Sequence, residues 1–235
     1  MEQASSVEGD IICGTSSGII DDITLPRRLE SIGGPIPFDV KHLRRLADGL
    51  LNEAAAIAKP VAFWQVALLE IEGDGDRISA KIGPIVLTNP VLTKNLAGLG
   101  RAFPYLATEG KELAQWAEKL PAKHKTAAFI IRYLALKEAE RRLEEKLKEL
   151  FGIPELGAMS PGVLPAWPLT GQKDLFKLLG PAPKQLGVTL QGESCWMSPD
   201  VSSSGLYFES QEGFHNCRLC PLERCSLRRF EREEQ

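Results

Sequence analysis

The sequence lacks the features that mark nucleic-acid-binding, membrane-spanning and many catalytic proteins. Its net charge is only −3, with 28 Lys and Arg against 31 Asp and Glu, so no basic excess favours nucleic acid or an anionic membrane surface. It contains no recognisable nucleophile motif and no glycine-rich phosphate loop. Its longest apolar runs, such as Val61–Leu69, are too short to cross a bilayer and include polar Gln65. Because the N-terminus is polar and acidic and resembles no signal peptide, we expect a cytoplasmic protein.

The order of the predicted elements favours an α+β fold. The patterns predict helices over 40–58, 90–99, 111–120 and 172–179, and strands over 10–13, 61–71, 77–87, 101–107, 187–190 and 205–208. Strands 61–71 and 77–87 are expected to form a hairpin across the acidic, glycine-containing turn between them. Strands and helices do not alternate regularly, which argues against a doubly wound sheet. We expect a polar N-terminal segment over 1–20, a main domain over 21–209 and a cysteine-rich tail over 210–235.

A long helix over 123–150 gives the clearest periodic pattern in the chain. Its apolar stripe is spaced as one helix face and is made of Ala127, Ile130, Ile131, Leu134, Leu143, Leu147 and Leu150. The charged residues over 137–148 are interpreted as a solvated face of this helix. The sequence 151–154, Phe-Gly-Ile-Pro, predicts its end.

The cysteines give the strongest indication of chemistry. Of the five in the chain, Cys217, Cys220 and Cys225 form a C-x2-C-x4-C pattern, and Cys195 precedes them. Thiolates at such spacing can reach a single [4Fe–4S] cluster or Zn²⁺ ion. The spacing does not separate these two, and the fourth ligand is Cys195, His215 or a group from outside the chain. An odd cysteine count clustered at one end argues against a disulfide framework and for a reducing compartment.

Two further segments are candidates for ligand binding. The loop 160–168 contains Pro161 and Gly162, and its proline and glycine residues leave backbone groups available to a polar ligand. In the segment 202–208, Tyr207 and Gly205 are expected on the opposite strand face from Leu206 and Phe208, as an open platform for a ring or ribose. Composition alone favours a structural connection for the loop and an edge-strand position for the tyrosine.

These segments resemble a known family. Residues 103–113, then 159–169 with the following helix, then 193–199 with 204–208, are similar to the activation domain of vitamin B12-dependent methionine synthase. They are more similar to its free-standing relatives in anaerobic bacteria, which share the cysteine tail. The resemblance implies a C-shaped α+β fold with a twisted antiparallel sheet. It also implies an S-adenosylmethionine groove around Pro161, Gly162, Ser204, Gly205 and Tyr207. Where the family has an arginine that meets the ligand's carboxylate, this sequence has Ala158.

The resemblance implies a role in corrinoid reactivation. The protein would act on a corrinoid protein or B12-dependent methyltransferase, whose cobalamin is reduced from Co(II) and then methylated by S-adenosylmethionine. The cysteine tail would carry the electron on a [4Fe–4S] cluster held by Cys195, Cys217, Cys220 and Cys225, with a ferredoxin as donor. Such a protein is an accessory redox subunit more than an independent enzyme. The alternatives are a zinc-stabilised module that binds a corrinoid protein without redox activity, and a component of an S-adenosylmethionine-dependent methyltransferase.

Overall fold

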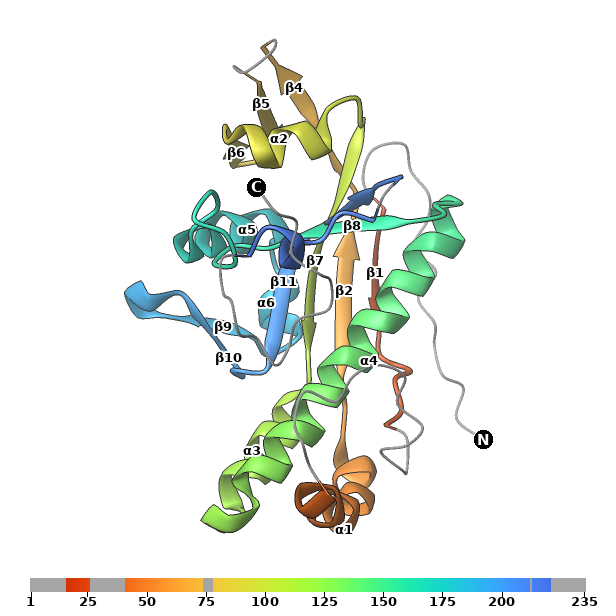
Figure 1. Cartoon of the computed structure of the whole chain (residues 1–235), viewed down its shortest axis with the longest axis vertical. Helices are drawn as coiled ribbons and strands as arrows, with labels where there is room; N and C mark the ends of the chain where they lie inside the picture. The colour runs from red at the N-terminus through yellow and green to blue at the C-terminus, as the bar shows by residue number, and fades with distance from the viewer. Residues whose placement is uncertain (1–15, 26–40, 74–77, 212, 221–235) are drawn as a thin grey trace.

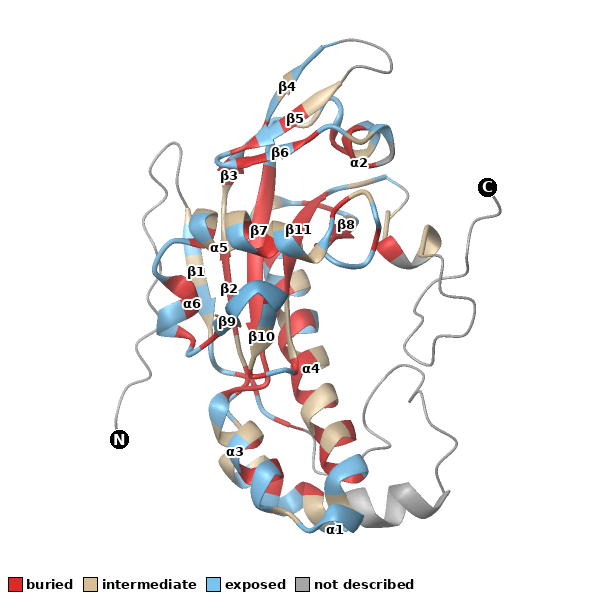
Figure 2. Ribbon diagram, turned by 90° about the vertical axis from the view of Figure 1, so that its left-hand side faces the viewer, coloured by how far each residue is buried: buried red, intermediate tan, exposed pale blue. Residues whose placement is uncertain are grey.

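An antiparallel sheet occupies the centre of the computed structural model, which describes residues 16–25, 41–73, 78–211 and 213–220, without the side chains of 41–48, 91 and 217. Its strand order is β1-β2-β7-β11-β8, and β3 pairs with β7. The strands are β1 (Ser17–Ile20), β2 (Val61–Gln65), β3 (Ala67–Leu68), β7 (Arg101–Thr108), β8 (Leu156–Met159) and β11 (Ser202–Glu209). The central strand β7 is buried along almost its whole length (Figure 2), because it has neighbours on both edges and packed layers on both faces.

Alternating side chains divide the core between the two faces of this sheet. In β11, Leu206 and Phe208 face one core cluster, and Tyr207 faces the other. In β2, Phe63 lies in the first cluster and Trp64 in the second. This is the alternation expected from the two-residue period of a strand. The prediction that Tyr207 and Leu206 point to opposite faces is therefore confirmed.

The long helix α4 (Lys125–Phe151) covers the Tyr207 face of the sheet (Figure 1). It ends at Gly152, whose φ of 64° is left-handed and suits glycine. The last sheet-facing position is Phe151, whose ring centroid lies 4.8 Å from that of Phe103. Leu150 is 47% exposed, so its assignment to the apolar stripe is wrong, because at the helix end the adjacent position faces the sheet.

Helices close the other sides of the molecule. The first helix, α1 (Lys41–Ile57), packs with α3 (Lys111–Lys119) and the start of α4 in a separate core cluster at one end of the molecule. On the Phe208 face lie α5 (Gln172–Leu179) and α6 (Ala182–Gln185). A two-stranded hairpin of β9 (Thr189–Gln191) and β10 (Trp196–Ser198) follows them. Short 3-10 turns occur at Ala122–His124, Leu169–Gly171, Gly192–Ser194 and Asn216–Arg218.

The expected hairpin between 61–71 and 77–87 is only partly correct. The first segment is divided into β2, β3 and β4 (Glu70–Glu72), and only β4 pairs with β5 (Ser79–Ile82). β2 pairs instead with β1 and β7. Strand β5 also pairs with β6 (Ile85–Leu87), and α2 (Pro90–Leu96) follows, forming the opposite end of the molecule (Figure 1). After Gln65, whose side-chain amide donates to the Leu178 carbonyl at 2.9 Å, the chain stays beside β7 through β3 and leaves the main sheet only after Leu68.

The fold is α+β, with antiparallel strands and flanking helices, as the sequence predicts. The strand expected at Asp10–Cys13 lies outside the described residues. Across the described ranges, no helix combines the length and apolar character needed to cross a membrane.

Candidate functional site

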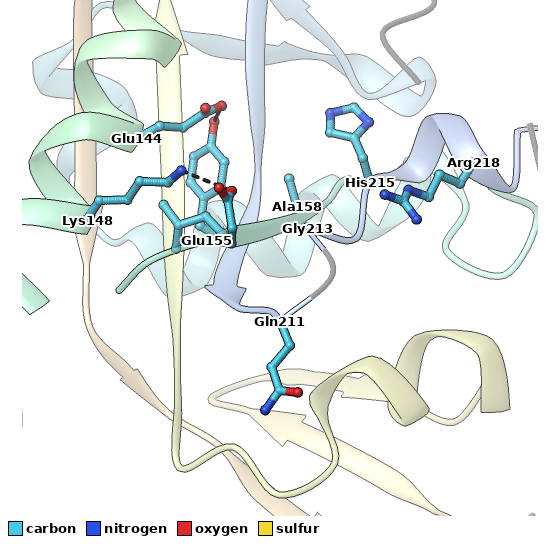
Figure 3. Close-up of a pocket in the computed structure, with 10 residues that line it drawn as sticks. Glu144, Lys148, Glu155, Ala158, Gln211, Gly213, His215 and Arg218 are labelled. Carbon is cyan, nitrogen blue, oxygen red and sulfur yellow. Dashed lines mark hydrogen bonds and ion pairs between the residues drawn. The ribbon is translucent and has the colours of Figure 1, made fainter. Parts of the chain in front are cut away.

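A cavity of about 300 Å³ lies on the Tyr207 face of the sheet, between α4 and the segment that follows β11. Its lining residues come from four parts of the chain. Helix α4 contributes Glu144 and Lys148, β11 contributes Tyr207, β8 contributes Leu156 and Ala158, and Glu155 directly precedes β8. The segment after β11, which we call the tail wall, contributes Gln211, Gly213, His215 and Arg218. Figure 3 shows the α4 and tail-wall side chains on opposite sides, with Ala158 between them.

A hydrogen-bonded tyrosine and carboxylate form the inner side of the cavity. The Tyr207 hydroxyl donates to Glu144 Oε1 at 2.9 Å. Its ring stacks on Tyr105 with centroids 4.2 Å apart. Burial raises the pKa of Tyr207 well above 10, and Tyr105 and Glu144 add to the increase. The phenol therefore stays neutral and holds the Glu144 carboxylate in place as a fixed acceptor.

Both signs of charge meet at this cavity. Lys148 Nζ lies 3.1 Å from Glu155 Oε2, in a pair whose side chains are 33% and 57% exposed. His215 and Arg218 bring imidazole and guanidinium groups from the tail wall. The small Ala158 and apolar Leu156 separate these groups. A site with a carboxylate on one side and a guanidinium on the other suits a ligand that carries both charges.

The tail wall is attached to the edge of the sheet. The Ala158 N–H donates to the Phe214 carbonyl at 2.7 Å, and Ala158 and His215 form a parallel bridge. The Phe214 ring lies 6.1 Å from that of Phe208. Asn216 Nδ2 donates to the Ser160 carbonyl at 3.4 Å. The segment thus covers the outer edge of β8 and fixes the positions of His215 and Arg218.

The structure brings only Tyr207 of the five predicted ligand-binding residues to this cavity. Ser204 lies on the opposite face, where its hydroxyl is 2.7 Å from Gln172 Oε1. Gly205 is packed against backbone, because an added Cβ would lie 2.3 Å from the Met159 carbonyl oxygen. Tyr207 is only 3% exposed. The expectation of an open platform is therefore wrong, since the neighbouring strand β8 fills the space beside the glycine.

Pro161 and Gly162 lie in the loop that leads from β8 to α5. The Gly162 N–H donates to the Trp167 carbonyl at 2.8 Å, and its φ is 85°. An added Cβ would meet the Leu169 side chain at 2.8 Å. The loop is thus folded on itself, and Asn216 of the tail joins it at Ser160.

The four predicted cysteine ligands are only partly described. Cys195 is fully buried in the turn between β9 and β10, with Sγ 3.5 Å from the Glu193 carbonyl. Its φ of 57° is unusual for a residue with a side chain. Cys220 is half-buried, whereas the Cys217 side chain and all of Cys225 lie outside the described part. Within that part, no three His, Cys, Asp or Glu side chains gather as a metal site.

The α4 contribution to the cavity was not expected from the sequence. The interpretation of 137–148 as a solvated face is wrong for two residues, because Glu140 is only 5% exposed and Glu144 is bonded to Tyr207. The spacing contained a signal, since Glu140 lies three positions before Leu143 and seven before Leu147, on the buried side of the helix. The role of the tail wall had no local signal, because it depends on pairing with β8.

The architecture places the chain with proteins that have a central antiparallel sheet covered by one long helix and shorter ones. Among similar solved structures is the crystal structure of the MetH reactivation domain bound to AdoHcy. It is 17% identical with a TM-score of 0.54, and the match covers 84% of this chain and 78% of that one. The fold is therefore similar to that of the reactivation domain. Neither a scan of protein-family models nor a search of curated proteins found a match.

Proposed function

We propose that this protein is a corrinoid reactivation module that binds an S-adenosylmethionine-type ligand. The observation that supports this most directly is the fold shared with the reactivation domain over most of the chain. The cavity on the Tyr207 face adds to it, since its opposed charges suit an amino-acid end. The partner would be a corrinoid protein or B12-dependent methyltransferase that presents its cobalamin to this module.

The chemistry requires one electron and one methyl group. Co(II) accepts the electron and becomes Co(I), which then takes the methyl group of S-adenosylmethionine. A carbon–sulfur bond breaks, a cobalt–carbon bond forms, and S-adenosylhomocysteine leaves. The methyl transfer removes Co(I) and so draws an unfavourable reduction forward. In this process the protein's own part is to bind the methyl donor and to shield the reacting centre from water.

We further propose that the cysteine tail delivers the electron through a [4Fe–4S] cluster. Cys217, Cys220, Cys225 and Cys195 are the proposed ligands, with His215 as the alternative to Cys195. Protein-bound clusters span roughly −700 to +450 mV, and Co(II) reduction needs the low end of that range. A reduced ferredoxin is the proposed donor, steered by the tail arginines Arg218, Arg224, Arg228 and Arg229.

Metal analysis of anaerobically purified protein tests the tail. We expect about four irons and about four sulfides per chain, with an absorption band near 400 nm that dithionite bleaches. Cys217→Ser should lose this band, whereas Cys13→Ser, in the N-terminal segment, should keep it. Zinc without sulfide would refute electron transfer and would leave a zinc-stabilised binding module.

Ligand binding and electron delivery are tested separately. Calorimetric titration with S-adenosylhomocysteine should show one binding site per chain. If the titration gives no heat of binding, and S-adenosylhomocysteine and S-adenosylmethionine do not compete for a site, the proposed ligand is refuted.

For the redox step, dithionite-reduced, desalted protein is mixed with cob(II)alamin and S-adenosylmethionine. Loss of the Co(II) electron paramagnetic resonance signal with appearance of methylcobalamin is expected. Protein lacking Cys217 serves as the control, and equal rates for both would refute the proposed route.

A further inference from the structure

The turn after β7 buries a carboxyl group that the proposed function does not use. The Glu109 side chain is 0% exposed, and its backbone N–H donates to the Val201 carbonyl at 3.3 Å. Arg132 Nε donates to Glu109 Oε2 at 2.7 Å, and Nη2 of the same guanidinium contacts both Glu109 Oε1 and Asp200 Oδ1. Asp200 is 69% exposed in the corner between β10 and β11. One arginine on α4 therefore joins two carboxylates from different segments, one buried and one in water.

The corner between β10 and β11 also has links to β7 that do not involve Asp200. The Ser202 hydroxyl lies 2.8 Å from the Thr108 hydroxyl and 2.8 Å from the Pro199 carbonyl oxygen. Strands β11 and β7 pair from this point onward, with Ser202 opposite Thr108. The contact of Asp200 with α4 is thus a side-chain link added to a corner that strand pairing already positions. Its loss should loosen the corner and leave the sheet folded.

Further charges near this turn are exposed or paired with each other. Lys111, at the start of α3, is exposed. Glu112 Oε1 lies 3.8 Å from Lys59 Nζ, in a pair whose side chains are 28% and 73% exposed. Because exposed charges interact weakly, the arginine on α4 and the aspartate of the corner are the charges that most affect Glu109.

The protonation state of Glu109 determines how strongly Arg132 attracts Asp200. Burial raises the pKa of Glu109 to about 7, although the contacts with Arg132 oppose this rise, and the charge of Asp200 adds to it. An ionised Glu109 competes with Asp200 for the guanidinium and repels the aspartate, whereas a protonated Glu109 does neither. Exposed aspartates are ionised across the range in which this proton is exchanged.

We propose that Glu109, Arg132 and Asp200 form a proton-controlled clasp, in which protonation of Glu109 transfers Arg132 to Asp200 and tightens the corner between β10 and β11. The proton comes from solvent and stays on the carboxyl group, so the switch is purely electrostatic. The corner follows the hairpin that carries Cys195 and precedes the strand that carries Tyr207. The clasp therefore restrains the junction between two segments of the proposed function, but it does not rest on that function.

Amide hydrogen exchange at residues 200–203 measures the clasp, because it reports local opening of the corner. Protection, corrected for intrinsic exchange rates, should be about 2- to 5-fold higher at pH 5 than at pH 8 in wild type, the range for an exposed charged pair. Glu109→Gln, which is neutral at both pH values, should show equal protection at both. Asp200→Asn should show the lower protection at both. Asp22→Asn is the matched control, because it breaks another exposed pair with α4, to Arg142 at 3.1 Å, and should keep the pH difference.

An NMR titration of the Glu109 carboxyl group provides an independent measurement. Asp200→Asn should lower the pKa of Glu109, because the aspartate raises it in wild type and the coupling between the two sites is reciprocal. An unchanged pKa would overturn the proposal. So would equal protection of the wild-type corner at both pH values, or a pH difference that persists in Glu109→Gln. A protection change of the same size in the paired strands β5 and β6 would show a global effect and would also overturn it.

Discussion

Removal of Arg132 should destabilise the protein, because it leaves the buried Glu109 carboxylate without its charged partner. Glu109 follows β7 and has a side chain that is 0% exposed, and Arg132 on α4 is 12% exposed. Arg132 Nε donates to Glu109 Oε2 at 2.7 Å, and its Nη2 contacts Glu109 Oε1. The same Nη2 reaches Asp200, which is 69% exposed and so contributes little. The bidentate contact is therefore the principal compensation for burying the Glu109 carboxylate.

The size of the effect follows from what Arg132→Met leaves behind. Breaking a buried ion pair by removing one partner costs about 3–5 kcal/mol. Because Asp200, on one side of Arg132, is exposed to solvent, we place this site near the lower end of that range. We expect a loss of about 3 kcal/mol in the free energy of unfolding at pH 8. At pH 5 the Glu109 carboxyl is neutral, so the substitution removes only ordinary hydrogen bonds. The free energy of unfolding should then fall by about 1 kcal/mol.

Urea unfolding of wild type and variants at both pH values measures this difference. Adding Glu109→Gln to Arg132→Met should recover part of the loss at pH 8, because the buried charge is then absent. Arg141→Met, which breaks exposed pairs with Glu138 and Glu145, should change the free energy by less than about 1 kcal/mol. A loss at Arg132 that is small, or the same at both pH values and unaffected by Glu109→Gln, would refute the reasoning.

Two other predictions concern single residues. Burial raises the pKa of Glu109 to about 7 from its ordinary 4.5, despite the opposing contacts of Arg132. Between these two pH values the folded state keeps a proton that the unfolded chain releases. The free energy of unfolding should therefore fall as pH rises from about 4.5 to 7. Unfolding of Glu109→Gln across this range should lack that part of the slope, and an unchanged slope would contradict the assignment. Gly205→Ala should cost about 1–3 kcal/mol, since its Cβ would meet the Met159 carbonyl at 2.3 Å. Gly49→Ala, in α1 with no atom within 4 Å of the added Cβ, should stabilise the protein by about 0.5–1 kcal/mol. Thermal unfolding of both glycine variants measures these changes. Equal effects of the two substitutions would disprove the packing argument.

Local patterns predicted most of the individual elements. The helix expected over 123–150 is α4 at Lys125–Phe151, and the strand expected over 101–107 is β7 at Arg101–Thr108. Both have strong periodicity or continuous burial, which depends on neighbours in sequence. The division of the segment 61–71 into separate strands was harder to predict, because its apolar residues suit any buried strand. The segment is divided because β2 pairs with β1 and β7, and β3 pairs with β7, which are distant in sequence, whereas only β4 pairs with the nearby β5.

The candidate site was less predictable than the elements that carry it. The sequence by itself determined that Tyr207 points away from Leu206 and Phe208, since alternation along a strand is local. Only the tertiary structure placed Tyr207 beside Glu144 and opened the cavity between α4 and the tail wall. Only it placed Ser204 on the far face and filled the space beside Gly205. The physical reason is that local periodicity fixes the direction of a side chain within its own element, whereas its neighbours depend on which strands pair and on how the elements pack.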